Sequence, residues 1–391
     1  MDFKLSSEQQ LLREGVSKFL AARYDLESSR AAAKSGPGWQ PDIWRGFADE
    51  LGILGATLPE SVGGSGGGSA EAMVIAEELG RALAIEPFVD TVIVSGGLLA
   101  RAGGATTAAV LEKVAAGSAI VALAVTEPDS GEHWEGVCTA AVRDGDHWVL
   151  SGAKTVVVSA PIATHLLIVA RIEQSVDSQA ISLFLTEFDA ATPPAGMTVH
   201  SYRTVDDRPA ADLIFENLRL PANALLQNDA WPSLALARDE GAAAVCAEAV
   251  GAMRKVLADT VDYSKQRQQF GQPIGSFQVL QHRMVDMYME LEQAVSAAYL
   301  AVLNLSAEPT ARARAVSAAK STVGRAARFI GRNAVQLHGG MGMTEELAIG
   351  HYFKRLTAMQ YEFGSTDFHR TRYAKLTRPS VRRPINESHT C

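Results

Sequence analysis

Apolar residues recur at helical spacing in the first third of the chain, beginning with Leu11, Leu12, Val16, Phe19 and Leu20. Ser6 precedes this run, and Gln9 lies three residues after Ser6, a pattern typical of a capping box at a helix start. The same periodicity returns over residues 70–84. We therefore predict a helical N-terminal region over residues 1–118.

The period changes near Ala119, where short runs rich in Val, Ile and Leu begin. We expect strands at Ile120–Val125, Val137–Arg143, His147–Leu150, Thr155–Ser159, His165–Ala170, Ala180–Leu185 and Leu213–Glu216. Asp144-Gly145-Asp146 is a hairpin turn signal. Because little sequence is left for helices between these runs, residues 119–225 are predicted to form an antiparallel β-domain.

Helical spacing resumes after Pro232, with Ser233 as the expected cap of a long helix that ends before Gly271. A second helix opens near Ser276, and its apolar positions form a seam: Leu280, Met284, Met287, Leu291, Val295, Ala298, Val302 and Leu305. Further helices are expected from Thr310 to Val335 and from Thr344 towards Tyr361. Residues 226–391 thus predict a four-helix bundle, and the whole chain an α+β protein in three parts.

Composition narrows the function classes. The 391 residues are 47% hydrophobic and 20% charged, which is typical of a soluble globular protein. A net charge of −8 argues against nucleic-acid binding, and no apolar run is long enough to span a membrane. Three widely separated cysteines, Cys138, Cys246 and Cys391, predict neither disulfides nor a zinc site. With no recognisable targeting segment at the start, a cytoplasmic location is expected.

Four segments carry residues suited to chemistry. Thr126-Glu127-Pro128 ends a predicted strand and could present hydrogen-bond donors to a ligand. Arg267 to Gly271 ends the long helix, where the guanidinium either complements the helix dipole or grips a diphosphate. Gln336 to Gly342 contains more glycines than a helix cap needs. Glu362, beside an aromatic ring and a glycine, could have a raised pKa and act as a general base, or simply be solvated.

A glycine-rich loop over residues 59–69 lacks the preceding strand and the third glycine of a dinucleotide fingerprint. It is either a flexible surface loop or a lid over a ligand.

Taken in order, these segments resemble the acyl-CoA dehydrogenase family of flavoproteins. The resemblance covers essentially the whole chain and also includes Leu51-Gly52-Ile53-Leu54, Gly152-Ala153-Lys154 and Ile274-Gly275-Ser276-Phe277-Gln278. It implies a helical N-terminal domain, a middle β-domain and a C-terminal bundle, usually assembled as a dimer of dimers. It also implies FAD, an acyl-CoA substrate oxidised to the trans-2-enoyl-CoA, and electron transfer to an electron-transfer flavoprotein.

The resemblance assigns one half of the FAD site to residues that reach the partner's FAD across the dimer: Arg267, Phe270, Gln278, Gln336, Gly339 and Gly340. Thr126 belongs to the other half, which faces the flavin ring. In that half the family's tryptophan and threonine are replaced by Val156 and Val158.

The base of the family reaction falls beside carboxylates rather than on them. Aligning the family's Tyr-Glu-Gly-Thr on Gly364 puts Phe363 at the base position, with Glu362 one residue early. The alternative base position on the long helix is Gly241, with Glu240 one residue early.

These departures leave three hypotheses. The chain is one subunit of a heteromeric acyl-CoA dehydrogenase whose homologous partner supplies the flavin-ring pocket and the base, as in small subunits of the pimeloyl-CoA or steroid side-chain type. Alternatively, it is a self-sufficient homo-oligomer that uses Glu362 or Glu240, or it is a related protein that binds acyl-CoA without oxidising it.

Overall fold

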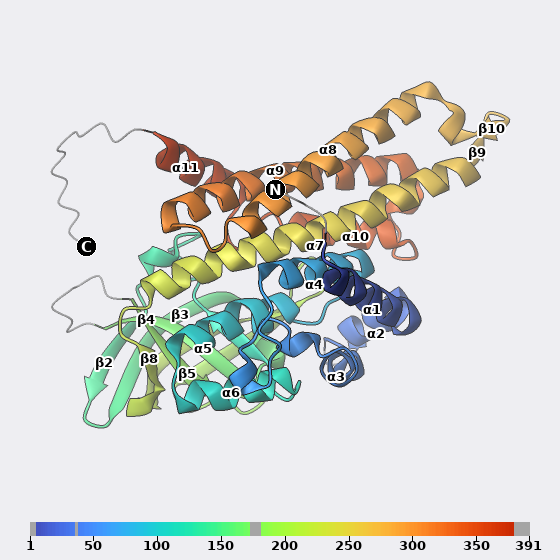
Figure 1. Cartoon of the computed structure of the whole chain (residues 1–391). Coiled ribbons are helices and arrows are strands. Elements are labelled where there is room, and N and C mark those ends of the chain that lie inside the picture. Colours follow the sequence, from blue (N-terminus) through green and yellow to red (C-terminus); the bar gives the residue numbers. More distant parts are fainter. Residues whose placement is uncertain (1–4, 36–37, 173–180, 379–391) are drawn as a thin grey trace.

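The computed structural model describes residues 5–35, 38–172 and 181–378. Helices come first, then strands, then helices again, as the sequence predicts (Figure 1). The N-terminal helices are α1 (Ser7–Arg23), α2 (Leu26–Ser35), α3 (Pro41–Asp49), α4 (Ser69–Ala82), the π-helix η3 (Val89–Ser95), α5 (Gly96–Ala102) and α6 (Ala105–Ala115). The capping box is confirmed, because the Gln9 amide N–H donates to Ser6 Oγ and the Ser6 N–H to Gln9 Oε1.

The middle region forms one sheet in the order β6-β7-β3-β2-β4-β5-β8, with β1 beside β4. Its strands are β1 (Val121–Ala124), β2 (Ala140–Asp144), β3 (His147–Val158), β4 (His165–Ile172), β5 (Ile181–Glu187), β6 (Met197–Arg203), β7 (Pro209–Pro221) and β8 (Leu225–Gln227). The hairpin at Gly145 is confirmed by the pairing of Asp144 with His147. Most neighbours are antiparallel, but β1 and β2 each pair with β4 in parallel, so the sheet is mixed.

The sequence missed β6 and β8, and it divided β3 into two strands. Between Lys154 and Val157 the pairing of β3 with β7 shifts register, and Val156 there has a left-handed φ of 51°. Such a bulge breaks the alternation of buried and exposed side chains from which a strand is recognised.

The C-terminal helices are α7 (Trp231–Gln266), α8 (Gln278–Leu303), α9 (Pro309–His338), α10 (Ala348–Ala358) and α11 (Thr366–Thr377). The predicted cap Ser233 is wrong, since α7 begins after Ala230 with Pro232 in its first turn, where the fixed φ of proline suits a helix start. The bundle of α7 to α10 was predicted, whereas α11 was not. No helix among the described residues combines the length and apolar character needed to cross a membrane.

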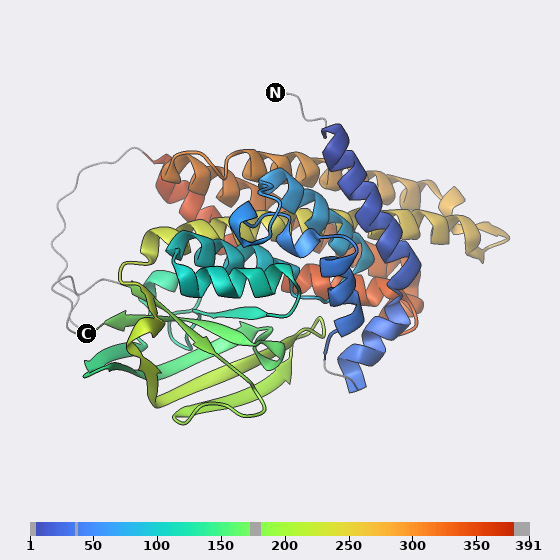
Figure 2. The ribbon, with the colours of Figure 1, turned by 60° about the horizontal axis from the view of Figure 1, so that its bottom comes forward.

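Figures 1 and 2 show α7 running between the N-terminal helices and the α8–α9 pair, with the sheet against one side of the helices. The crossing of α4 and α7 depends on two glycines. A Cβ built on Gly80 would lie 2.0 Å from the Glu248 carbonyl oxygen, and one on Gly251 would lie 1.8 Å from that of Glu77. The two backbones therefore touch at this crossing, which fixes α7 against the N-terminal region.

We predict that Gly251→Ala lowers the free energy of unfolding by about 2–3 kcal/mol or more, because the added methyl group forces the helices apart. The matched control is Gly15→Ala in α1, where a Cβ meets no atom within 4 Å. This control should be neutral or stabilising by about 0.5–1 kcal/mol. Chemical denaturation of the three proteins measures both effects, and equal stability of the Gly251 variant and the parent would contradict the described crossing.

Candidate active site

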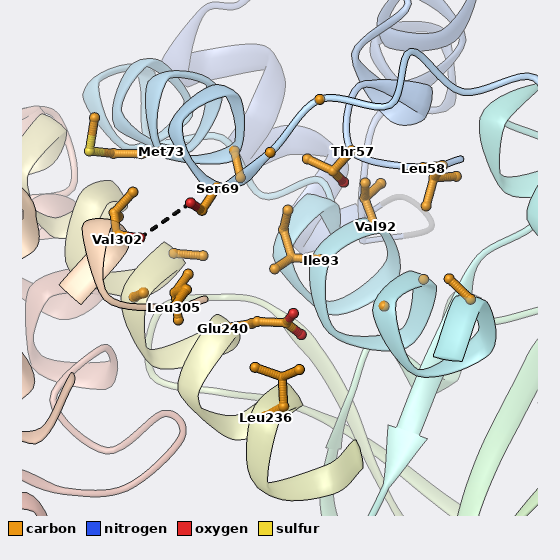
Figure 3. Close-up of a pocket in the computed structure, with 18 of the residues that line it drawn as sticks. Thr57, Leu58, Ser69, Met73, Val92, Ile93, Leu236, Glu240, Val302 and Leu305 are labelled. Atoms are coloured by element: carbon orange, nitrogen blue, oxygen red, sulfur yellow. Dashed lines mark hydrogen bonds between the residues drawn. The ribbon is translucent and has the colours of Figure 1, made fainter. Parts of the chain in front are cut away.

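Two cavities lie back to back across the π-helix η3. The first, of about 420 Å³, lies between α4, α5, α7 and the end of α8 (Figure 3). The second, of about 510 Å³, lies between the sheet, η3 and the loop after α10. Val92 and Ile93 line the first cavity, whereas Asp90 and Val94 line the second. No described residue lines both, so in this chain η3 and its neighbours form a wall between them.

Phe363 occupies the base position in the loop after α10. Its backbone is left-handed, with a φ of 57°, and its ring lies against Gly241 of α7, where a Cβ would come within 2.6 Å of the ring. Trp134 meets the same ring edge to face at 6.3 Å. Both positions that the family resemblance gives to a base are therefore occupied by residues without a carboxylate, and these two residues pack on each other.

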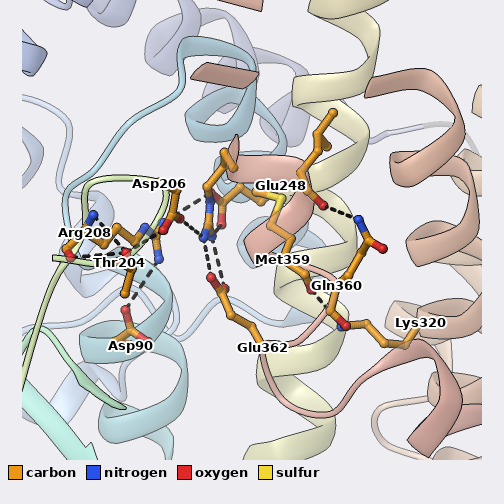
Figure 4. Close-up of polar contacts among 11 residues, drawn as sticks. Asp90, Thr204, Asp206, Arg208, Glu248, Lys320, Met359, Gln360 and Glu362 are labelled. Atoms are coloured by element: carbon orange, nitrogen blue, oxygen red, sulfur yellow. Dashed lines mark hydrogen bonds and ion pairs between the residues drawn. The ribbon is translucent and has the colours of Figure 1, made fainter. Parts of the chain in front are cut away.

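Lys320 fixes the loop that carries Phe363. Its buried ammonium group donates to the carbonyl oxygens of Met359, Gln360 and Gly364 at 2.8, 3.2 and 3.0 Å. Figure 4 shows Lys320 beside Met359 and Gln360. All three protons of the ammonium group have acceptors, so its burial is compensated. The direction of Phe363 is thus set by a charge-assisted contact from α9.

Glu362 lies in the second cavity and forms a paired contact with Arg355 of α10, with Nη2 donating to Oε2 at 3.1 Å. Burial opposes ionisation of this carboxyl, but Arg355 and Arg208 outweigh it and hold its pKa below the usual value. The raised pKa suggested by the sequence is therefore not found. The assignment of Glu362 as a base stays a prediction.

Arg355 is the centre of a buried ionic network that the sequence analysis missed. Its guanidinium also donates to Glu248 at 2.9 Å and to Asp206 at 2.8 Å. Arg208 joins through Glu248 at 3.2 Å and lies 3.8 Å from Asp90, whose pKa is raised to about 6 by burial in spite of Arg208. Figure 4 shows these groups meeting from η3, the β6–β7 turn, α7 and the end of α10.

One signal for this network was present in the sequence. Glu248 stands alone in an alanine-rich, otherwise apolar stretch of α7. An isolated carboxylate in such a stretch requires a buried cation as partner. The sequence does not reveal that this partner is Arg355, more than 100 residues away.

Glu240 lies in the first cavity, apart from Glu362. Its Oε1 accepts from Nη1 of Arg101 at 3.0 Å, and burial raises its pKa although Arg101 partly offsets the effect. Gly67 and Gly68 of the glycine-rich loop line the same cavity. The two candidate bases therefore face different cavities.

The residues expected to reach a partner's FAD gather at the far end of the bundle. Tyr263 of α7 stacks on His338 of α9 at 4.3 Å, which brings the two helix ends together. All six are exposed, and the Phe270 side chain at the tip is 91% exposed: Arg267, Phe270, Gln278, Gln336, Gly339 and Gly340. An exposed guanidinium beside an exposed ring suits a diphosphate and a flat group supplied by another chain.

Thr126 lies apart from this end, in the second cavity together with Val156 and Val158. The apolar walls of this cavity suit a flat ring, but its charged groups do not suit a diphosphate. Five carboxylates line it, Asp90, Glu127, Glu132, Asp206 and Glu362, against the guanidinium of Arg208, which is already paired with Glu248. The Glu132 carboxylate occupies the position at the start of α11 where a ligand's phosphate could otherwise bind. It accepts hydrogen bonds from the Ser365 backbone N–H and, at 2.8 Å, from the Ser365 hydroxyl.

Glu127 is paired inside this cavity. The buried Lys154 donates to it at 2.6 Å, and burial lowers the pKa of this lysine to about 8 although Glu127 partly offsets the effect.

The described residues contain no cluster of His, Cys, Asp and Glu suited to a metal, and within them Cys138 and Cys246 are free thiols. Cys391 lies outside the described residues.

Comparison with known proteins identifies the family. The N-terminal, middle and C-terminal domain models of acyl-CoA dehydrogenase match residues 6–118, 122–218 and 231–376. The acyl-CoA dehydrogenase IpdE2 of Mycobacterium tuberculosis is 31% identical, with 89% of this chain and 90% of that protein covered. The probable acyl-CoA dehydrogenase YngJ of Bacillus subtilis is 29% identical, with 95% and 98% covered.

Solved structures of this family have the same fold as this chain. A variant of the Tcur3481-Tcur3483 steroid ACAD superposes with a TM-score of 0.84 at 29% identity, over 94% of this chain and 97% of that one. The ChsE4-ChsE5 complex of Mycobacterium tuberculosis has the same fold, with a TM-score of 0.86 at 23% identity, over 97% and 100% of the two chains. The chain belongs to the acyl-CoA dehydrogenase family of oxidoreductases, whose cofactor is FAD.

Proposed function

We propose that this chain is one subunit of a heteromeric, FAD-dependent enzyme that oxidises an acyl-CoA to a trans-2-enoyl-CoA. The observation that carries the proposal is the packing of Phe363 on Gly241. These are the two positions from which the family resemblance supplies a base, and neither has a group that accepts a proton.

The neighbouring carboxylates do not replace the missing base in this arrangement. Abstraction of the α-proton needs a carboxylate within hydrogen-bond reach of the substrate, with a pKa near the working pH. Glu362 is held by Arg355 with a lowered pKa, and Glu240 faces the cavity on the other side of η3. The base is therefore assigned to a homologous partner.

This chain contributes to the cofactor site through its exposed end. When bound, FAD supplies the hydride acceptor for oxidation of the Cα–Cβ bond. Arg267 would hold the diphosphate of the partner's FAD, and Phe270, Gln278, Gln336, Gly339 and Gly340 would enclose the adenosine side. The apolar walls around Thr126 would suit a flavin ring, but the carboxylates of this second cavity would not suit the attached diphosphate, so we assign the ring as well to the partner's pocket.

An exposed apolar surface on α8 is evidence for binding of a partner subunit. Beyond the residues that face the bundle, this helix exposes Val279, Val285, Tyr288, Met289, Leu300 and Leu303. A large exposed apolar surface in a globular protein marks an interaction site.

We propose a dimer of dimers that acts in the cytoplasm, in fatty acid or steroid side-chain catabolism, and passes electrons to an electron-transfer flavoprotein. The names of two similar structures support two parts of this proposal: a steroid ACAD supports the steroid substrate, and the ChsE4-ChsE5 complex supports a heteromeric assembly.

A self-sufficient homo-oligomer is the second candidate, and the raised pKa of Glu240 favours it. In that case Glu240 takes the proton, and the wall at η3 has to open so that the substrate can reach the flavin ring.

We predict that Arg267→Ala in the assembled complex weakens FAD retention by roughly tenfold or more, because it removes a charge-assisted contact to the diphosphate. Flavin absorbance after gel filtration at limiting FAD measures the effect. The control is Arg219→Ala, whose exposed side chain pairs with Asp144 at 2.8 Å on the sheet and should leave flavin content unchanged. Full retention by the Arg267 variant would contradict the cross-subunit site.

We further predict that Glu362→Gln and Glu240→Gln, tested separately in the complex, each lower kcat by less than about threefold, whereas loss of a general base costs about 10²–10⁴-fold. The amide preserves the shape of the side chain, but in Glu362→Gln its NH2 group cannot accept from Arg355 as a carboxylate oxygen does. Melting temperatures therefore show whether the Arg355 network survives. A loss of 100-fold or more in one intact variant would place the base on this chain.

A further inference from the structure

The first cavity contains an ion pair that the proposed reaction does not use. Of its described lining residues, Arg101 and Glu240 are the charged ones, and the remaining walls are mainly apolar or glycine. Figure 3 shows Glu240 among apolar side chains that include Leu236, Ile93 and Leu305. The volume of about 420 Å³ lies within the range of about 300–1,000 Å³ that is typical of small-molecule pockets.

The pair is incompletely satisfied. One bond joins Arg101 Nη1 to Glu240 Oε1 at 3.0 Å, but Arg101 Nε, Arg101 Nη2 and Glu240 Oε2 are buried without a hydrogen-bond partner. Buried polar atoms are almost always hydrogen-bonded, so such atoms beside a cavity indicate a missing partner. Space for the pair is provided by Gly97, where a Cβ would lie 3.1 Å from both Arg101 Nη1 and Glu240 Oε2.

The free atoms define the partner's chemistry. Two N–H donors and one carboxylate acceptor remain in a pair whose charges balance. A hydroxyl group both donates and accepts, so it can bond the guanidinium and the carboxylate at once. A carboxylate ligand would be repelled by Glu240, and an ammonium ligand by Arg101.

We propose that the cavity between α4, α5, α7 and α8 binds an apolar molecule carrying a hydroxyl group, and that the Arg101–Glu240 pair recognises this hydroxyl. The inference goes beyond the proposed function, because it concerns binding by this chain and needs neither flavin nor turnover. The ligand is either a free alcohol or the acyl part of a hydroxyacyl thioester, since both present the same group.

The test compares ligands that share an eight-carbon chain. The ¹³C-methyl signal of Met73, which lines the cavity, reports binding to the full-length chain by NMR. We expect 1-octanol to bind about tenfold or more tightly than methyl octyl ether, because both oxygens can accept from Arg101 but only the hydroxyl can also donate to the charged Glu240 carboxylate. Octanoate and octylammonium should bind more weakly than the alcohol.

The same comparison between 8-hydroxyoctanoyl-CoA and octanoyl-CoA distinguishes the two sources. Preference for the hydroxylated thioester, with tighter binding than 1-octanol, identifies a thioester. Preference among the free ligands alone identifies an alcohol. If no ligand shifts the Met73 signal, if the ether binds as well as the alcohol, or if octanoate binds best, the proposal is overturned.

The double variant Arg101→Leu with Glu240→Leu removes both charges together and so leaves neither unpaired. It should reduce the preference for 1-octanol over the ether to less than about threefold while keeping affinity for the ether. The matched control is the double variant Arg219→Leu with Asp144→Leu, an exposed pair on the sheet, which should keep the full preference. An unchanged preference in the first variant, with melting confirming its fold, overturns the role of the pair.

Discussion

The buried network around Arg355 is the constraint on which the site depends. Two guanidinium groups and four carboxylates meet there from all three regions of the chain. Removing one member of a buried ion pair typically costs about 3–5 kcal/mol, because the remaining charge is left without compensation. The network therefore ties η3, the β6–β7 turn, α7 and the end of α10 to each other, and it decides where Glu362 points.

Two consequences follow for the chemistry. Glu362 is held by Arg355 with a lowered pKa, which supports the proposal that the α-proton is taken by another group. The adjacent Phe363, directed by the Lys320 contacts, fills the space above Gly241 with its ring. The same loop that would present a base in the family resemblance here presents a packed ring. In the function proposed above, a chain built in this way keeps the acyl-CoA dehydrogenase fold and relies on a partner for the base.

The sequence predicted the order of the three regions, the capping box at Ser6 and the bundle seam, because these depend on local periodicity and capping chemistry. It missed β6 and β8 and took the sheet as antiparallel, because strand pairing is set by long-range contacts. Resemblance placed Phe363 and Gly241 at the base positions, but their mutual contact follows only from the packing of the loop on α7. The Arg355 network and the unsatisfied Arg101–Glu240 pair join residues more than 100 positions apart, which local patterns do not report.

The proposal that this chain supplies only half of an FAD site is tested most directly by the amount of FAD bound per chain. Visible absorbance measures this amount on the protein purified alone and after co-expression with its homologous partner. We expect little or no FAD on the chain alone, and both FAD and acyl-CoA oxidation in the complex. About one FAD per chain in the isolated protein, together with turnover, would contradict it and favour a self-sufficient enzyme.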